Sequence, residues 1–96
     1  MSKHNEQSIK QGIQELLKAY GLSQKLNEVK LINSWGKVMG KMIANHTNNI
    51  YIKNKCLFLK LDSSALRNEL SYAKTKIVAM MNEEVGEHVI EEVIIQ

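Results

Sequence analysis

The sequence has no proline, a single cysteine and no long hydrophobic run. One cysteine, Cys56, cannot form an internal disulfide, and together with three scattered histidines it cannot build a structural zinc site. No run of about 18 apolar residues is present, which excludes a transmembrane helix. Residues 1–6 hold no apolar segment of the kind that a secretory signal needs. We therefore expect a cytoplasmic protein with no metal site and no contact with a membrane.

Motifs of catalysis are also missing. There is no Gly-x-Ser-x-Gly, no phosphate-binding glycine loop and no His-Glu-x-x-His. Cys56 falls in an expected strand, and His46 follows an expected helix, where packing or capping is its simplest role. The acidic residues near the end lack the spacing of a calcium loop. The sequence predicts a protein that is not an enzyme and needs no cofactor.

Charge is distributed unevenly along the 96 residues, which at 11.0 kDa make one domain. All thirteen Lys and Arg residues lie in 1–82 with only five acids, so this part carries +8. Residues 83–96 contain five glutamates and no Lys or Arg, and carry −5. A basic body favours a surface that binds a polyanion such as nucleic acid. Solubility alone would explain the same numbers.

Two helices are expected at the start of the chain. Residues 1–7 are predicted to be a flexible N-terminus, and residues 8–96 a single domain. Ser8 can cap a helix that ends at Gly21, with apolar residues at helical spacing. Ser23 can cap a second helix that runs to Ile43. Gly36 and Gly40 lie inside it and cost about 1 kcal/mol each relative to alanine, so the alternative is a break near Gly36.

A hairpin, a helix and a last strand follow. Residues 50–53 and 56–62 alternate apolar and polar side chains around Asn54-Lys55, as two paired strands do. A helix capped within 62–64 extends to about residue 82, and residues 89–95 form the last strand. The order α-α-β-β-α-β predicts an α+β domain with a three-stranded sheet backed by helices.

One face of the hairpin combines aromatic and basic side chains: Tyr51, Lys53, Phe58 and Lys60. Rings stack on bases for about 1–3 kcal/mol each, and lysines neutralise phosphates, so this face suits single-stranded nucleic acid. The alternative is that a further layer of the protein or a second subunit covers it. Five more residues are candidates to extend the basic patch: Lys37, Lys41, Lys55, Arg67 and Lys74. Lys37 and Lys41 are expected on one face of the second helix, and Arg67 and Lys74 on one face of the third.

Trp35 is the only tryptophan. Core packing is one interpretation of it. A contact with a partner is the other, because tryptophan is enriched at binding hot spots.

Several segments resemble one bacterial family. Trp35-Gly36-Lys37-Val38-Met39-Gly40, followed by Ile43-Ala44-Asn45-His46-Thr47, resembles the W-x-x-V-x-G…I-A-x-H-T signature of the DciA family of replicative-helicase loaders. The strand 57–61, the helix start 63–70 and the segments near residues 77–86 and 89–95 are similar as well. The resemblance covers about residues 8–96.

The resemblance implies a small domain similar to a type II KH domain. It also implies a non-enzymatic protein that binds the replicative helicase and single-stranded DNA and promotes helicase loading. Two features depart from these patterns: the chain lacks the long basic C-terminal extension of many members, and it lacks the Gly-x-x-Gly loop with which KH domains clamp nucleic acid. The alternatives are an RNA-binding module of ribosome or RNA metabolism, and a structural partner domain, such as a homodimer, that binds no nucleic acid.

Overall fold

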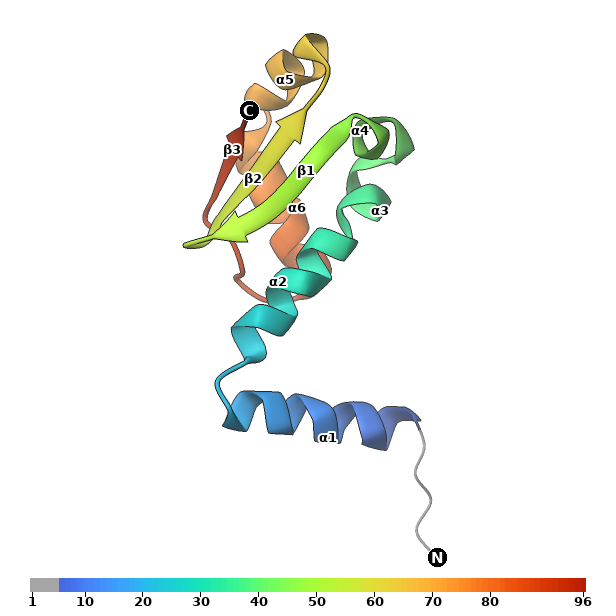
Figure 1. Cartoon of the computed structure of the whole chain (residues 1–96), viewed down its shortest axis with the longest axis vertical. Helices are drawn as coiled ribbons and strands as arrows, with labels where there is room; N and C mark the ends of the chain where they lie inside the picture. The colour runs from blue at the N-terminus through green and yellow to red at the C-terminus, as the bar shows by residue number, and fades with distance from the viewer. Residues whose placement is uncertain (1–5) are drawn as a thin grey trace, which may run out of the picture.

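A computed structural model describes residues 6–96 of the chain (Figure 1). These residues form a mixed α+β structure with a three-stranded sheet, as predicted. The elements, in chain order, are α1 (Glu6–Ala19), α2 (Ser23–Asn33), α3 (Trp35–Met39), α4 (Lys41–Asn45), β1 (Thr47–Lys53), β2 (Cys56–Leu61), α5 (Ser64–Ser71), α6 (Lys74–Val85) and β3 (Glu92–Ile95).

The predicted hairpin is confirmed by β1 and β2, which pair antiparallel with Lys53 opposite Cys56. Asn54 and Lys55 form the turn, and both have positive φ angles of 51° and 61°. Such two-residue turns match the twist of paired strands, and asparagine tolerates this backbone region better than most residues.

The last strand joins the same sheet. β3 pairs parallel with β2, so the sheet order is β1-β2-β3 and β2 is central. The strand is shorter than predicted and begins at Glu92. Val89 and Ile90, which were expected in it, are fully buried in the segment before it. Their side chains fill the core while their amides bond to a side chain of α6, so no strand pairing is needed there.

Helices cover one face of the sheet. Leu57, Leu59 and Leu61 point from β2 into this side and are at most 3% exposed. In Figure 1, α6 lies behind the sheet, and among the described residues no element lies in front of it. The other buried residues that complete the core come from the helices, from β3 and from the segment before it: Leu31, Trp35, Leu66, Leu70, Ile77, Met81, Val89, Ile90 and Val93.

The second predicted helix is not continuous. It is divided at Ser34 and again at Gly40, giving α2, α3 and α4. Gly40 has φ 94° and ψ 162°, a conformation that is essentially restricted to glycine. The two breaks lie on either side of Gly36, two residues before it and four residues after it, so the alternative of a helix broken near Gly36 is confirmed. Ser23 does not cap α2 either, since it is the first residue of the helix.

The third predicted helix is also divided. Ser63 caps α5 as expected, because its Oγ accepts a hydrogen bond from the Leu66 amide at 3.3 Å. The helix ends at Ser71, and α6 begins at Lys74. The apolar residues predicted to face the core still do so on both sides of this break, because Leu70 and Ile77 are both buried.

The first helix extends away from the rest of the structure (Figure 1). With this helix, the longest dimension of the structure is 58 Å. α1 begins at Glu6, so residues 6 and 7 are helical, and residues 1–5 lie outside the described part. It ends at Ala19, and Gly21 just beyond it has the positive φ of 72° expected of a terminating glycine, with the Leu22 amide donating to the Leu17 carbonyl at 2.7 Å. No residue of α1 is buried, and its apolar stripe is exposed. None of the described helices is long and apolar enough to cross a membrane.

Candidate nucleic-acid interface

The aromatic side chains on the open face of the sheet form one stacked pair. Tyr51 of β1 is directly opposite Phe58 of β2. Their ring centroids are 4.7 Å apart and the rings are within 7° of parallel. Tyr51 is 40% exposed, whereas Phe58 is half-buried, with Ile94 of β3 beside it in register.

This stacking changes what the face can bind. We expected each ring to receive a base of its own. Here Tyr51 and Phe58 each cover one face of the other, and Ile94 lies on the far side of Phe58. The geometry leaves the outer face of Tyr51 as the surface for a base, with Phe58 holding that ring in place.

Two lysines flank the stacked pair along the strands. Lys53 follows Tyr51 by two residues and Lys60 follows Phe58 by two, so all four side chains share one face. Lys53 is opposite Cys56, which places the two lysines about 13 Å apart at 3.3 Å per residue. Both are exposed, and no ion pair is recorded for either within residues 6–96. They are free to neutralise phosphates on either side of a stacked base.

Two other predicted lysines are paired with the acidic segment. Lys37 Nζ of α3 lies 2.8 Å from Glu84 Oε2 of α6, on the helix side of the structure. Lys55 Nζ at the hairpin turn lies 3.8 Å from Glu91 Oε1. The acidic residues 83–96 thus neutralise part of the basic body.

The remaining predicted basic residues lie on three different helices: Lys41 on α4, Arg67 on α5 and Lys74 on α6. Gly40 places Lys37 and Lys41 on separate helices, and the kink between α5 and α6 separates Arg67 from Lys74, so the expected shared helical faces are wrong. Arg67 Nη1 donates to the Leu61 carbonyl at 2.7 Å and ties α5 to the end of β2. Lys74 lines a groove beside β3.

Trp35 belongs to the core. It is 3% exposed, and its Nε1 donates to Thr47 Oγ1 at 3.0 Å. That hydroxyl donates in turn to the Ile43 carbonyl at 2.7 Å, so the tryptophan links α3, α4 and β1. A buried ring offers no surface to a partner, which corrects the partner-binding interpretation.

Asn82 is a structural residue that the sequence reasoning missed. Its Oδ1 accepts from the Val89 and Ile90 amides at 2.9 and 3.0 Å, and its Nδ2 donates to the Ile90 carbonyl at 2.8 Å. These bonds fix the segment that leads into β3. The only signal in the sequence is an amide side chain one turn before Gly86.

Cys56 lies on the same face as Tyr51. Burial, followed by the charge and hydrogen bond of Glu92, raises the pKa of its thiol. The Cys56 Sγ is 3.8 Å from Glu92 Oε2. A raised pKa keeps the thiol protonated, which is unlike an activated nucleophile.

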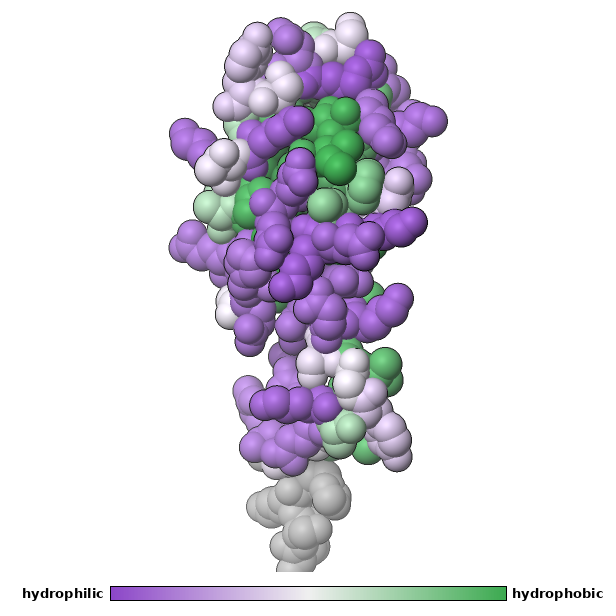
Figure 2. Space-filling view, turned by 90° about the vertical axis from the view of Figure 1, so that its left-hand side faces the viewer, coloured by the Kyte–Doolittle hydropathy of each residue, from purple (hydrophilic) through white to green (hydrophobic). Residues whose placement is uncertain are grey.

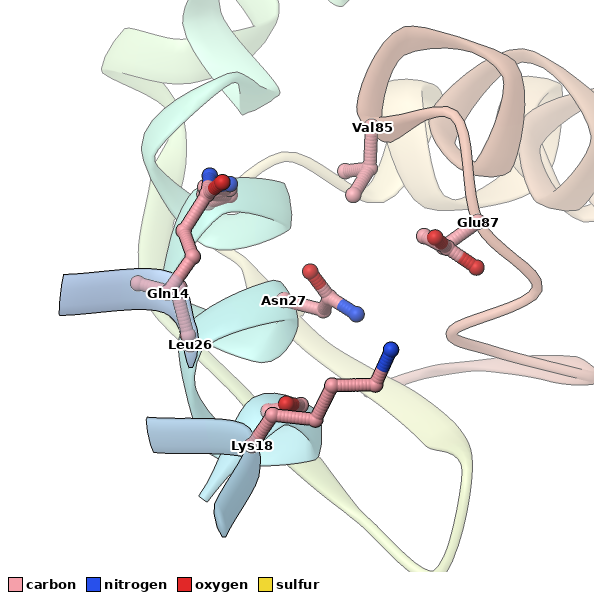
Figure 3. Close-up of a pocket in the computed structure, with 8 residues that line it drawn as sticks. Gln14, Lys18, Leu26, Asn27, Val85 and Glu87 are labelled. Atoms are coloured by element: carbon pink, nitrogen blue, oxygen red, sulfur yellow. The ribbon is translucent and has the colours of Figure 1, made fainter. Parts of the chain in front are cut away.

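A polar cavity lies beside α1 (Figure 3). Its volume is about 510 Å³, and it lies between α1, α2 and the segment after α6. Lys18, Asn27 and Glu87 extend toward the space between these elements. The charged residues of its lining are two lysines, Lys18 and Lys30, and one carboxylate, Glu87.

The chain matches the family described as Dna[CI] antecedent, DciA, over residues 8–95. This match covers most of the sequence and confirms the resemblance seen in the residues. The chain belongs to the DciA family. That family is non-enzymatic and is associated with the replicative helicase DnaB.

One curated DciA-type relative supports this assignment. It is a "UPF0232 protein" of Corynebacterium glutamicum (strain R), 35% identical over 60 residues. The alignment covers 62% of this chain and 34% of the relative, so the chain matches about a third of that protein's length. No solved structure matches the chain.

Proposed function

We propose that this DciA-family chain is an accessory protein of DNA replication that binds single-stranded DNA on the open face of its sheet. It helps the replicative helicase to load onto that strand and catalyses no reaction itself. The observation that carries this proposal is the stacked Tyr51–Phe58 pair between two lysines that form no ion pair within residues 6–96. A ring for a base and cations for the adjacent phosphates are what sequence-tolerant binding of a single strand needs.

The fold proposed with this function is a type II KH-like domain. A hairpin, a helix pair and a third strand parallel to the central strand support that assignment. The connection between α5 and α6 reads Tyr72-Ala73 and has no Gly-x-x-Gly. Binding on the sheet face, rather than a backbone clamp between the helices, is therefore the mode that we propose.

Fluorescence anisotropy with labelled oligo(dT) tests the binding step. Tyr51→Ala should weaken binding about 5- to 150-fold, since one base stack is worth about 1–3 kcal/mol. Tyr72→Ala is the matched control, because Tyr72 is 85% exposed on the helix side and should leave affinity unchanged. Equal losses in the two variants, or none in Tyr51→Ala, would contradict the proposal.

Salt dependence tests the roles of the lysines. Replacing Lys53 or Lys60 by glutamine should reduce the slope of log K against log salt by about 0.7 per lysine. Lys37→Gln should leave the slope unchanged, because that lysine is paired with Glu84. If oligo(U) binds more tightly than oligo(dT) under the same conditions, the RNA-binding module replaces the DNA proposal.

Helicase loading is tested directly. The replicative helicase is mixed with labelled single-stranded DNA, and the bound helicase is measured with and without this protein. We expect more helicase on the strand when the protein is present. The increase should be smaller when the Tyr51→Ala variant replaces the unmodified protein. No gain with the unmodified chain would refute the loading role, whatever the chain itself binds.

A further inference from the structure

The outer edge of β3 has no strand beside it in the part of the chain that the structure describes. β3 pairs only with β2. The Gln96 amide donates to the Leu59 carbonyl at 2.8 Å, and the Gln96 carbonyl accepts from the Leu61 amide at 3.0 Å. Because backbone groups alternate in direction along a strand, those of Val93 and Ile95 point away from β2. This edge offers donors and acceptors to another extended backbone.

A groove runs along this edge. It lies between α6 and β3, with a volume of about 160 Å³, and is lined by Lys74, Thr75, Val78, Glu91, Glu92 and Val93. Val78 from the helix and Val93 from the strand give it an apolar floor. On the side of the molecule that carries β3, Figure 2 shows apolar side chains gathered between hydrophilic ones. The groove therefore has room for an apolar side chain next to the edge backbone.

The groove lining holds two carboxylates, Glu91 and Glu92, and one cation, Lys74, so its net charge is −1 and favours a basic ligand. Glu91 and Glu92 lie where β3 begins. Glu91 is shared between Lys55 and His88, whereas Glu92 contacts the Cys56 thiol and forms no ion pair with a cation among residues 6–96. Two carboxylates repel the phosphates of a nucleic acid. They attract lysine or arginine side chains instead.

We propose that the β3 edge binds an extended segment of a partner protein, which adds to the sheet antiparallel to β3 as a fourth strand, so that its residues opposite Val93 and Ile95 exchange both backbone hydrogen bonds with them. Apolar residues of that segment would enter the groove over Val78 and Val93. Its lysines or arginines, which alternate with them, would lie on the opposite face near Glu92. This mode takes its affinity from main-chain hydrogen bonds and its selectivity from alternate side chains. It is independent of the nucleic-acid face and would hold if that proposal failed.

Two capped pentapeptides test the proposal by NMR titration of the isotope-labelled full chain. The probe reads Lys-Val-Lys-Val-Lys, and the comparison peptide has the same sequence with N-methyl groups on both valines. The probe should shift the amide signals of β3 and of residues 74–78, and slow hydrogen exchange at Val93 and Ile95. The methylated peptide keeps the charges and loses valine amide donors, so it should bind clearly more weakly. Equal binding would show that charge alone attracts the probe and would overturn the proposal.

Charge-reversal variants test the contribution of the carboxylate. Glu92→Lys should weaken binding of the probe peptide by about two- to fivefold, the range expected for loss of an exposed ion pair. Glu83→Lys makes the same charge change on the other side of α6, beside Lys37, and should have little effect. Similar losses in both variants, no shifts at β3 with millimolar probe, or larger shifts there with oligo(dT) would each reject a peptide site at this edge.

Discussion

Asn82 should be one of the costliest polar residues to remove. Its side chain makes three hydrogen bonds to the backbone of Val89 and Ile90, both fully buried. At about 1 kcal/mol net per bond, Asn82→Ala loses about 3 kcal/mol. Alanine returns about 0.5 kcal/mol through its better helix propensity in α6. The expected net loss in the free energy of unfolding is about 2.5 kcal/mol, or about 10–20 °C in melting temperature for a domain of this size.

Urea unfolding followed by circular dichroism measures this loss. Asn68→Ala is the control, because Asn68 is exposed in α5 and no side-chain hydrogen bond is recorded for it within residues 6–96. That variant should be unchanged or slightly more stable. Amide exchange adds a local test, since protection at Val89 and Ile90 should fall even under conditions where Asn82→Ala stays folded. A loss below about 1 kcal/mol, or unchanged protection at these two amides, would refute the reasoning.

Three further predictions follow from the same structure. Trp35→Ala should cost about 3–5 kcal/mol in urea unfolding because it empties a core site, and a loss below about 1 kcal/mol would argue against that role. Gly40→Ala should lower the free energy of unfolding by about 1–3 kcal/mol, because φ is 94° there. Gly12→Ala inside α1 should raise it by about 1 kcal/mol. Thermal unfolding that ranks the two variants the other way would contradict this. The reaction of Cys56 with a thiol reagent should have its pH midpoint above that of a free cysteine, since a raised pKa lowers the thiolate fraction at any given pH, and Glu92→Gln should move the midpoint down. An unchanged midpoint in Glu92→Gln would remove the carboxylate as a cause.

The hairpin was predictable because its signals are local. Alternation over a few residues and a two-residue turn define the strands, and the burial of Leu57 and Leu59 follows from the same alternation. The division of the helices was harder to predict. Gly40 was a visible signal, but Ser34 has a nearly helical backbone, with φ −90° and ψ −4°, and Tyr72 is not a residue that usually ends a helix. Neither break carries a glycine or proline signal, so periodicity alone does not reveal it.

For the candidate site, the sequence predicts which side chains share a face of the sheet. It does not predict how those side chains are arranged on that face. Alternation places Tyr51 and Phe58 on one side of the hairpin, but the pair register decides that they stack on each other. The pairing of Lys37 with Glu84 joins residues 47 positions apart, so a count of charges along the chain could not anticipate it. Similarly, Trp35 could be assigned to the core only once the hydroxyl of Thr47 was seen beside its indole.

The placement of Trp35 gives the protein an internal optical reporter. It is the only tryptophan, and it is buried between the short helices and the start of β1, away from the open face that carries Tyr51. Selectively excited tryptophan emission therefore follows the packing of the core and shifts to that of a solvated indole on unfolding. A ligand that stacks on Tyr51 should leave this emission nearly unchanged. Tryptophan emission thus reports the folded state of the protein with or without a ligand on the open face.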